Sequence, residues 1–468
     1  RGRPARPAVT RAAGAALLAA LLLAARAAAA APPYNVVLIG LDAARADRFG
    51  CYGGPLKASP AVDAFAKTAV VFDRAVSQAS WTLPSFASLF TAEDTQTHGL
   101  TDPSRRLGPG TRTLAQVLRA RGFATAAFAS PPFFDRRYGL DRGFDDYVVG
   151  PRTRSFAGSM PLALAWLAKH RKKRFFLFLH SNDVHAPYDA PPPYRDEFDP
   201  GYAGPAKGLD PSVYFFMVYD GELTPDFGPP PSAAYAARVE RIRADPASRA
   251  YLAARYQAGI AYADHFLGRL WSRLRALGLD RDTIVVVLSD HGEELGERGR
   301  FGHNYAVWDD VTRVPLIVRV PGLKTAGPRV AAQVRLIDVA PTILDAEGIP
   351  APAGFEGGSL LPLLEGRGGA PSRLAFTSSD VPGRRQALFA VGDGRWKLVR
   401  DERRPAPALY DLKDDPGETR DVSAAHPKTA ARLERDLSAW LARPAPASAG
   451  APQDRAAREA LKAAGYLP

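Results

Sequence analysis

The chain has 468 residues, of which 46% are hydrophobic and 24% are charged, a composition typical of globular proteins. Its formal net charge of +12 at pH 7 would suit nucleic-acid binding, but the arginines are dispersed and form no basic stripe with interleaved aromatic residues. The one dense basic run, at 171–174, is interpreted as a solvated helix end, so no nucleic-acid partner is expected. A basic surface still favours anionic substrates or anionic lipid.

The N-terminal segment has the pattern of an export signal. Four arginines in the first eleven residues precede a short apolar stretch at 12–25 and an alanine run that ends in Pro-Pro. Residues 1–31 are therefore predicted to be a signal peptide of a periplasmic or extracellular protein. The alternative is an uncleaved membrane tether, although the apolar stretch is shorter than the about 20 residues of a typical span. The single cysteine, Cys51, excludes internal disulfides.

Apolar runs and helical patterns then alternate along the chain. The apolar runs predict buried strands within 35–42, 124–130, 174–188, 283–294 and 314–322. Helical spacing is found at 113–123, 248–277 and 338–349. Alternating strands and helices predict an α/β fold with a large, mostly parallel central sheet covered by helices on both faces.

Two further segments depart from this alternation. Residues 189–235 are rich in Pro, Gly, Tyr and Asp without a clear period, which favours a substrate-covering insertion. From about residue 372, short antiparallel strands with a hairpin turn at Asp393-Gly394 precede a helix at 427–442. The predicted domains are an α/β domain at 34–370, an α+β subdomain at 371–442 and a flexible tail at 443–468.

Three of the apolar runs end in residues that can bind a metal ion. Asp42 closes the first, His180 and His185 close the third, and Asp290 and His291 close the fourth. Ligands bind beyond the carboxyl ends of strands in open parallel sheets, so these side chains are expected to converge. An Asp after a strand is by itself more often a turn residue. Together, these carboxylates and an imidazole indicate a site for a divalent cation.

The stretch ASWTLPSF at 79–86 places Thr82 at or just before the start of a predicted helix. One interpretation is a helix cap, in which Ser80 or Thr82 accepts an amide hydrogen bond. The other is a nucleophile, since a hydroxyl becomes reactive near pH 7 when a metal or base lowers its pKa. A cation between the two aspartates and His291 would bind the Thr82 oxygen directly.

Two more histidines are candidates for proton transfer. His303 lies on the Gly-rich stretch GRFGHNYAVWDD, and it could donate to substrate oxygens or act as a general acid. His185 could have either of the same two roles, and Pro187 and Tyr188 would fix the turn after it. For both, a solvated loop histidine without a catalytic role is the alternative.

These residues lie in segments that resemble the sulfatase family of the alkaline-phosphatase superfamily. Nine blocks match in order over 35–442, among them NVVLIGLD, WTLPSF, FLFLHSNDVHAPY, TIVVVLSDHGEE and ALYDLKDDPGETRDV. The resemblance implies a large α/β domain followed by a small domain with a short antiparallel sheet and a helix. It also implies one divalent ion (Ca, Mn, Mg or Zn). By position it implies metal ligands Asp42, Thr82, Asp290 and His291, catalytic residues Thr82, His185 and His303, and substrate-binding residues Arg45 and His180.

The chain departs from this family at three positions. Sulfatases proper carry Cys or Ser, any residue, Pro, any residue and Arg, and convert the first residue to formylglycine. Here Thr82 and Phe86 stand at the first and last of these positions, and threonine cannot yield that aldehyde. Ala43 stands where a second acid usually follows the first. Threonine nucleophiles look more like those of lipoteichoic acid synthases and phosphoethanolamine transferases, which act on phosphoesters.

The sequence therefore predicts an exported, metal-dependent hydrolase of sulfate or phosphate esters with a threonine nucleophile. A phosphoryl-group transferase of the phosphoethanolamine or lipoteichoic type is one alternative. The other is a non-catalytic homologue that binds an anionic glycan or lipid head group.

Overall fold

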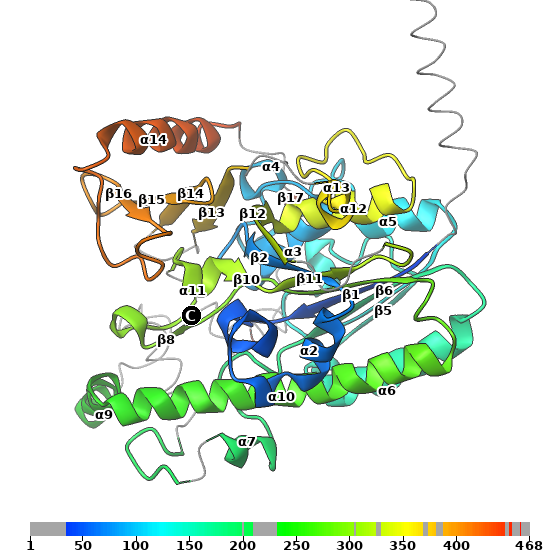
Figure 1. Ribbon diagram of the computed structural model, residues 1–468, viewed down its shortest axis with the longest axis horizontal. Coiled ribbons are helices and arrows are strands. Elements are labelled where there is room, and N and C mark those ends of the chain that lie inside the picture. Colours follow the sequence, from blue (N-terminus) through cyan, green and yellow to red (C-terminus); the bar gives the residue numbers. More distant parts are fainter. Residues whose placement is uncertain are drawn as a thin grey trace, which may run out of the picture.

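The computed structural model (Figure 1) describes residues 34–198, 201–208, 232–303, 306–323, 329–367, 373–380, 387–444, 449–451 and 459. The predicted signal segment at 1–31 lies outside these residues, as do 209–231 of the predicted insertion, so export stays a prediction. Within the part of the chain that is described, no helix combines the length and apolar character needed to cross a membrane.

A nine-stranded sheet forms the centre of the larger domain, in the order β10-β2-β11-β7-β1-β6-β4-β5, with β12 paired to β2 outside this path. The strands are β1 Asn35–Leu41, β2 Val70–Val76, β4 Ala124–Ala129, β5 Asp146–Val149, β6 Phe175–Ser181, β7 Thr283–Ser289, β10 Arg313–Val314, β11 Leu316–Arg319 and β12 Arg329–Arg335. The five strands from β7 to β5 are parallel, while β11 runs antiparallel to β7 and β2. The predicted α/β class with a mostly parallel sheet is confirmed, and the antiparallel pairs make the sheet mixed.

The central strand β1 shows why an unbroken apolar run forms here. All seven of its residues are buried, and successive side chains point to opposite faces of the sheet. Val36 and Leu38 join the core on one face, and Val37, Ile39 and Leu41 join the core on the other. A strand that packs on both faces has no polar side to present to water, so its sequence does not alternate.

Helices cover both faces of the sheet (Figure 1). On one face lie α3 Thr82–Thr91, α5 Leu114–Ala120 and α12 Val339–Ala346, and on the other lie α2 Pro60–Ala66, α6 Phe156–His170 and α10 Pro246–Ala276. Thus α5, α10 and α12 are the helices expected at 113–123, 248–277 and 338–349. The shorter elements are β3 Arg105–Arg106, β8 Glu294–Leu295, β9 Phe301–Gly302, β17 Ala449–Gly450, α4 Thr95–His98, α7 Tyr194–Glu197, α9 Ala233–Ala244, α11 Asp309–Thr312 and α13 Leu361–Leu364.

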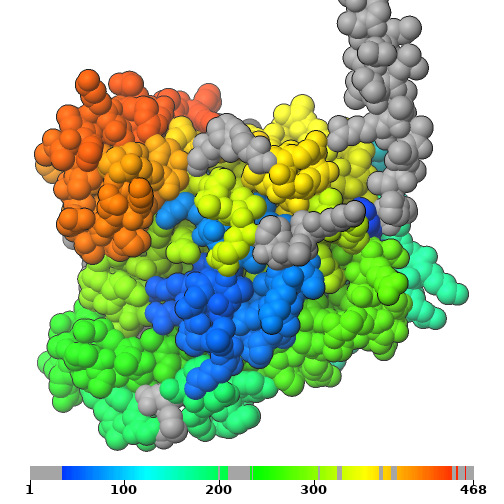
Figure 2. Space-filling view, viewed as in Figure 1, coloured from blue at the N-terminus to red at the C-terminus, as the bar shows by residue number. Residues whose placement is uncertain are grey.

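A smaller C-terminal subdomain packs on one end of the larger domain, where Figure 2 shows it in orange. Its antiparallel sheet comprises β13 Ala375–Ser379, β14 Leu388–Gly392, β15 Trp396–Asp401 and β16 Ala408–Asp411, and α14 Pro427–Leu441 covers it. The expected hairpin at Asp393-Gly394 joins β14 to β15, with Gly394 at φ 101°, a conformation that favours glycine. Within the predicted tail, β17 pairs with β3 of the larger domain.

Truncating Trp440 should destabilise the subdomain. This side chain is 1% exposed, and it stacks on Phe376 with ring centroids 5.2 Å apart. Trp440→Ala leaves a cavity between α14 and its sheet, so we expect the free energy of unfolding to fall by about 3–5 kcal/mol. Urea denaturation measures this change. Arg435→Ala, on the exposed side of the same helix, should change the free energy by less than about 0.5 kcal/mol; equal effects of the two variants would contradict the packing argument.

The subdomain also holds the segment that leads into α3. Strand β13 contacts residues 77–80 through an isolated bridge between Ala79 and Ser378. Ser378 donates its N–H to the carbonyl of Gln78 at 3.0 Å, and Ser80 donates its N–H to the carbonyl of Ser378 at 3.2 Å. The position of the α3 N-terminus, and hence of Thr82, is therefore set partly by residues almost 300 positions later in the chain.

Candidate active site

The residues predicted at the strand ends lie on three neighbouring parallel strands. Leu41, the last residue of β1, is in register with Ser181 of β6 on one side and Ser289 of β7 on the other. Asp42 and Asp290 therefore leave the sheet side by side. His180, the next-to-last residue of β6, is paired with Gly40 at the same edge. The carboxyl ends of parallel strands meet at one edge, as the sequence pattern required.

Asp42, Asp290 and His291 form a buried cluster that could hold a cation. One ligand atom from each residue lies within 4.8 Å of the others. His291 Nε2 is 3.4 Å from Asp42 Oδ1 and 3.4 Å from Asp290 Oδ2. Asp290 Oδ2 is buried and has no hydrogen-bond partner among the described residues. Two carboxylates and one imidazole, with an acceptor atom left unsatisfied, fit the ligand set of a divalent ion.

The hydrogen bonds of His291 indicate which of its nitrogens faces this cluster as an acceptor. Nδ1 lies 2.9 Å from the carbonyl oxygen of Gly292, which only an N–H group can satisfy. In the neutral ring, the Nε2 lone pair is therefore directed at the two carboxylates. This arrangement is unfavourable unless Nε2 is protonated or a cation lies between the three groups. A backbone carbonyl that fixes the tautomer is a usual partner of a metal-binding histidine.

The pKa values of the cluster lead to the same conclusion. Burial by itself would raise the pKa of Asp42, but His185, His291 and His180 around it lower that pKa well below its usual range. Burial raises the pKa of Asp290 to about 7, and the nearby Asp42 carboxylate adds to this rise. Burial alone would lower the pKa of His291, yet the two aspartates raise it to about 9. The two buried carboxylates thus need a positive charge among them.

Thr82 is the first residue of α3 and faces the cluster. Its Oγ1 is 3.4 Å from His291 Nε2 and 3.5 Å from Asp42 Oδ1. The N-cap position belongs to Trp81, and Ser80 Oγ has no hydrogen-bond partner among the described residues. Ser85, one turn further along the helix, donates its hydroxyl to the carbonyl of Asp290 at 2.8 Å. This geometry favours a hydroxyl that belongs to the cluster over a hydroxyl that caps the helix.

His98 packs behind α3, and its burial makes the fold sensitive to acid. Leu100 donates its N–H to Nδ1, so Nε2 carries the proton and donates to Ser88 Oγ at 2.9 Å. Burial lowers the pKa of His98 from 6.5 to about 3. The unfolded chain therefore takes up this proton first, and the free energy of unfolding falls as the pH drops from about 6.5 towards 3.

Through His98, the free energy of unfolding should fall by about 2 kcal/mol between pH 7 and pH 5. In His98→Gln no proton can be taken up at this position, so the same fall in pH should lower the free energy of unfolding by a smaller amount. Urea unfolding of both proteins at the two pH values measures the difference. Parallel pH dependences would show that His98 does not carry the effect.

The two candidate proton-transfer histidines lie next to the cluster. The ring centroid of His303 is 4.2 Å from that of His291 and 5.2 Å from that of His185. His303 Nδ1 is 3.1 Å from Oε1 of Glu293, a fully buried carboxylate that the sequence analysis did not select. Burial lowers the pKa of His303 and raises that of Glu293 to about 7.

His180 lies at the edge of the cluster against an aromatic wall. Ser130 donates its N–H to Nδ1 at 3.4 Å, which leaves the proton on Nε2, 3.7 Å from Asp42 Oδ2. Burial lowers the pKa of His180 to about 4, so the ring is neutral. Phe86 packs edge-on against it, with centroids 4.9 Å apart, and approaches Gly40 so closely that a Cβ there would lie 2.7 Å from the ring. Position 86 therefore supplies packing and no charge.

Arg45 points away from the cluster. Its guanidinium donates to Asp47 and Asp310, to Glu297 Oε1 at 2.8 Å and to the carbonyl of Glu293 at 3.0 Å. All five N–H groups are thereby engaged by protein acceptors. Arg45 thus fixes the loop that carries Glu293, which favours its structural role over direct contact with a substrate.

Tyr256 of α10 supports the loop after Asp42. Its hydroxyl donates to the carbonyl of Ala43 at 2.6 Å and accepts the N–H of Arg45 at 2.7 Å. Ala43 has a φ of 59°, a left-handed conformation that is uncommon for a residue with a side chain. The hydrogen bonds of Tyr256 stabilise this strained turn, so they fix the backbone at Ala43, the position that lacks the usual second acid.

Comparison with known proteins relates this chain to ester hydrolases. The chain belongs to the sulfatase family, whose sequence profile matches residues 34–349. A second profile, described as the C-terminal part of N-sulphoglucosamine sulphohydrolase, matches residues 296–443. The chain is 23% identical to an N-acetylglucosamine-6-O-sulfatase of Bacteroides thetaiotaomicron, over 83% of this chain and 82% of the relative. It is 28% identical to an ulvan-active sulfatase of Formosa agariphila, over 74% and 68%.

Solved structures share the fold. The phosphonate monoester hydrolase of Agrobacterium radiobacter superimposes with a TM-score of 0.71 at 23% identity, over 88% of this chain and 96% of that protein. A protein crystallised with its substrate D-glucosamine-2-N,6-O-disulfate gives a TM-score of 0.70 at 22% identity, over 88% and 99%. The predicted sulfatase-like α/β fold with a small C-terminal subdomain is thereby confirmed.

Proposed function

We propose that this protein hydrolyses sulfate or phosphate esters and that Thr82 is its nucleophile. The observation that carries the proposal is the position of Thr82 Oγ1, within 3.5 Å of both Asp42 Oδ1 and His291 Nε2 in a buried carboxylate–imidazole cluster. A divalent ion bound by Asp42, Asp290 and His291 would lower the pKa of this hydroxyl and attract the anionic oxygens of the ester.

The residues of the chain account for the other requirements of the reaction. With a cation bound, the Thr82 hydroxyl would lose its proton to water, and Oγ1 would then attack sulfur or phosphorus as the bond to the leaving oxygen breaks. The backbone N–H groups of Thr82 and Leu83 lie at the N-terminus of α3, where the helix dipole would stabilise negative charge on the group being transferred. Water then cleaves the threonyl ester and regenerates the hydroxyl.

The histidines beside the cluster are the groups that would protonate the leaving oxygen. His303 Nδ1 lies 3.1 Å from the Glu293 carboxylate, and His185 lies next to His303 on the loop after β6. His185 is only partly buried, so it is the more accessible of the two. Because burial lowers the pKa of His303, this ring would need to gain a proton when the anionic ester binds, which the nearby negative charge favours.

A substrate panel tests the proposal. Purified protein, stripped of metal and reloaded with Ca, Mn, Mg or Zn, is offered an aryl sulfate, a phosphate monoester, a phosphodiester and a phosphonate monoester. The names of the relatives support sulfate esters, and those of the structural neighbours support phosphonate esters as well. Release of sulfate or phosphate to water is expected. Transfer of the group to an added alcohol would instead favour the transferase, and binding without any turnover the non-catalytic homologue.

A further inference from the structure

A buried lysine of the C-terminal subdomain contacts the larger domain at α11. Lys397, in β15, is 5% exposed, which is uncommon for a lysine unless its charge is paired. Its Nζ donates to Asp309 Oδ1 at 3.0 Å and to Thr312 Oγ1 at 3.3 Å, so it contacts both ends of α11. It also lies 2.9 Å from Glu418 Oε1 in the subdomain. One ammonium group therefore connects α11 to the subdomain.

Two neighbouring side chains complete this buried network. Arg74 of β2 donates to Asp309 Oδ2 at 2.8 Å, and Glu418 accepts the N–H of Asp309 through Oε2 at 2.5 Å. Glu418 has a φ of 54°, a left-handed conformation that is uncommon for a residue with a side chain. Burial by itself would raise the pKa of Asp309, but Lys397 and Arg74 lower it well below its usual range. Asp309 is therefore ionised, and α11 is held by charged partners from both domains.

The backbone of α11 in turn holds the loop that carries two of the candidate metal ligands. Gly292 donates its N–H to the carbonyl of Val311 at 2.7 Å. The next residue, Glu293, donates its N–H to the carbonyl of Asp310 at 3.1 Å. A Cβ at position 292 would lie 2.1 Å from the Asp310 oxygen, so this close approach requires glycine. The carbonyl of Gly292 also accepts from His291 Nδ1 at 2.9 Å, so the position of α11 helps to set the orientation of the His291 ring.

We propose that Lys397 is a positioning residue for the metal-ligand loop, residues 290–293. Loss of its ammonium group would free α11 from the subdomain, and the backbone that orients His291 would lose part of its support. Lys397 is not a ligand of the cluster, so its effect passes through α11. The inference rests on the proposed function in one respect, because it takes Asp42, Asp290 and His291 to bind a divalent ion.

Calorimetry on the full chain, in the absence of any ester, tests this role. The protein is stripped of metal and titrated separately with Ca, Mn, Mg and Zn, and the binding that Asp290→Asn abolishes is assigned to the cluster. Lys397→Met should weaken this binding about tenfold, the lower end of the effect of mutating groups that orient metal ligands. Lys397→Arg should weaken it less, because the charge is kept. Unchanged affinity in Lys397→Met would overturn the proposal.

A second variant separates positioning from unfolding. Lys397→Met leaves Asp309 and Glu418 close together without the lysine between them, so it should lower the unfolding temperature. In Lys397→Met/Glu418→Gln one of the two acids is neutral, while Arg74 still pairs with Asp309. This double variant should fold, as circular dichroism can show, and should still bind the cation about tenfold more weakly. Full affinity in the folded double variant would contradict the positioning role.

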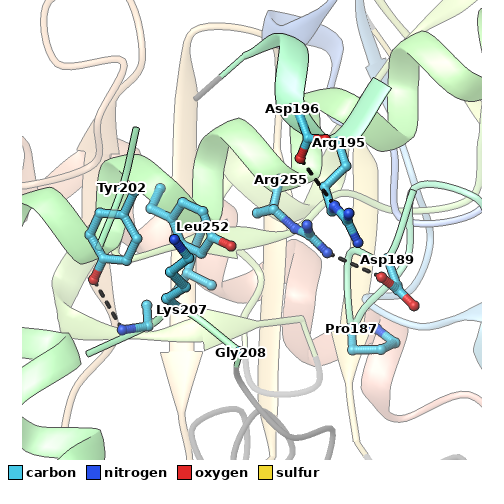
Figure 3. A pocket seen from close by; sticks show the side chains of 11 residues that line it. Pro187, Asp189, Arg195, Asp196, Tyr202, Lys207, Gly208, Leu252 and Arg255 are labelled. Carbon is cyan, nitrogen blue, oxygen red and sulfur yellow. Dashed lines mark hydrogen bonds and ion pairs between the residues drawn. The ribbon is translucent and has the colours of Figure 1, made fainter. Parts of the chain in front are cut away.

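Two control variants account for the loss of stability and of charge. Arg174→Met leaves the buried Glu347 side chain without its partner at 2.5 Å, at the amino end of β6 and away from the cluster at its carboxyl end. Arg195→Met removes one positive charge, whose partner is the adjacent Asp196 at 3.1 Å (Figure 3). Neither variant should change the cation affinity. Equal weakening in Arg174→Met and Lys397→Met would show that stability alone is responsible and would overturn the proposal.

Kinetics distinguish this proposal from the function on which it rests. In the active protein, the cation concentration that gives half-maximal turnover should rise about tenfold in Lys397→Met, the same factor as the Kd. If the cation affinity depends on Lys397 but no ester is cleaved, the positioning role is supported and the hydrolase is wrong. If esters are cleaved and Lys397→Met leaves the cation requirement unchanged, the hydrolase is supported and the positioning role is wrong. An unaltered protein that binds none of the four cations would overturn the inference.

Discussion

Thr82→Ala should lower kcat by at least about 10³-fold, because no other hydroxyl takes the place of a missing nucleophile. The Thr82 side chain is 3% exposed and makes only long contacts, at 3.4 and 3.5 Å, so its loss should leave the fold intact. The free energy of unfolding is expected to change by less than about 1 kcal/mol. Initial rates on the best substrate of the panel, with urea unfolding of both proteins, measure the two effects.

Ser80→Ala is the matched control for this prediction. Ser80 also lies just before α3, and its buried hydroxyl has no hydrogen-bond partner among the described residues, so its removal should leave kcat nearly unchanged. Mass spectrometry of a rapidly quenched reaction should find a sulfuryl or phosphoryl group on the peptide that contains Thr82. Full activity of Thr82→Ala would show that Thr82 is not the nucleophile. Equal losses of kcat in Thr82→Ala and Ser80→Ala would indicate a structural role for the segment.

Removal of the metal should abolish activity and destabilise the fold. Without a cation, the imidazole of His291 is the only positive group that the described residues place between the buried Asp42 and Asp290 side chains, and burial raises the pKa of Asp290 to about 7. A cation supplied at 100 times its Kd should raise the free energy of unfolding by about 2.7 kcal/mol relative to the chelated protein. Thermal unfolding with EDTA and with each of the four candidate ions measures this shift and ranks them.

Asp290→Asn tests whether the stabilisation comes from this cluster. The amide keeps the shape of the side chain but removes a charge that the cation needs, so the added ion should no longer raise the unfolding temperature. Asp436→Asn, on the partly exposed side of α14, changes the net charge equally and should leave the metal effect intact. A metal effect that persists in Asp290→Asn would place the ion elsewhere in the protein.

The convergence of Asp42, Asp290 and His291 could be predicted because local signals coincide with sheet geometry. Each of β1, β6 and β7 is a fully buried apolar strand, and each is followed or closed by a polar side chain. Parallel neighbours bring such positions to one edge whatever the intervening sequence, so Asp42 and Asp290 had to meet if the strands were adjacent. The start of α3 at Thr82 follows from similarly local features, an early proline and an apolar helical face.

Other parts of the site have no local signal. Glu293 and the neighbouring Glu294 are the same residue type, so the sequence does not show which of them contacts His303. The contact of Glu293 with His303 requires the β8–β9 loop to fold back. Tyr256 lies in the middle of a 31-residue helix, and its hydroxyl meets Ala43 across 213 positions of sequence. Strand β12 was not predicted, because only its last three residues are buried and its residues are mostly polar or small.

The succession of apolar strands along the chain, the α/β class and the residue types at the strand ends could be predicted from the sequence alone, because the apolar pattern is formed by residues close together in the chain. The tertiary structure decided which groups contact those residues: the carboxylate beside His303, the acceptors that engage Arg45 and the β13 contact that positions α3. These depend on contacts between distant segments, and the free energy of such contacts is fixed only when the whole sheet has assembled.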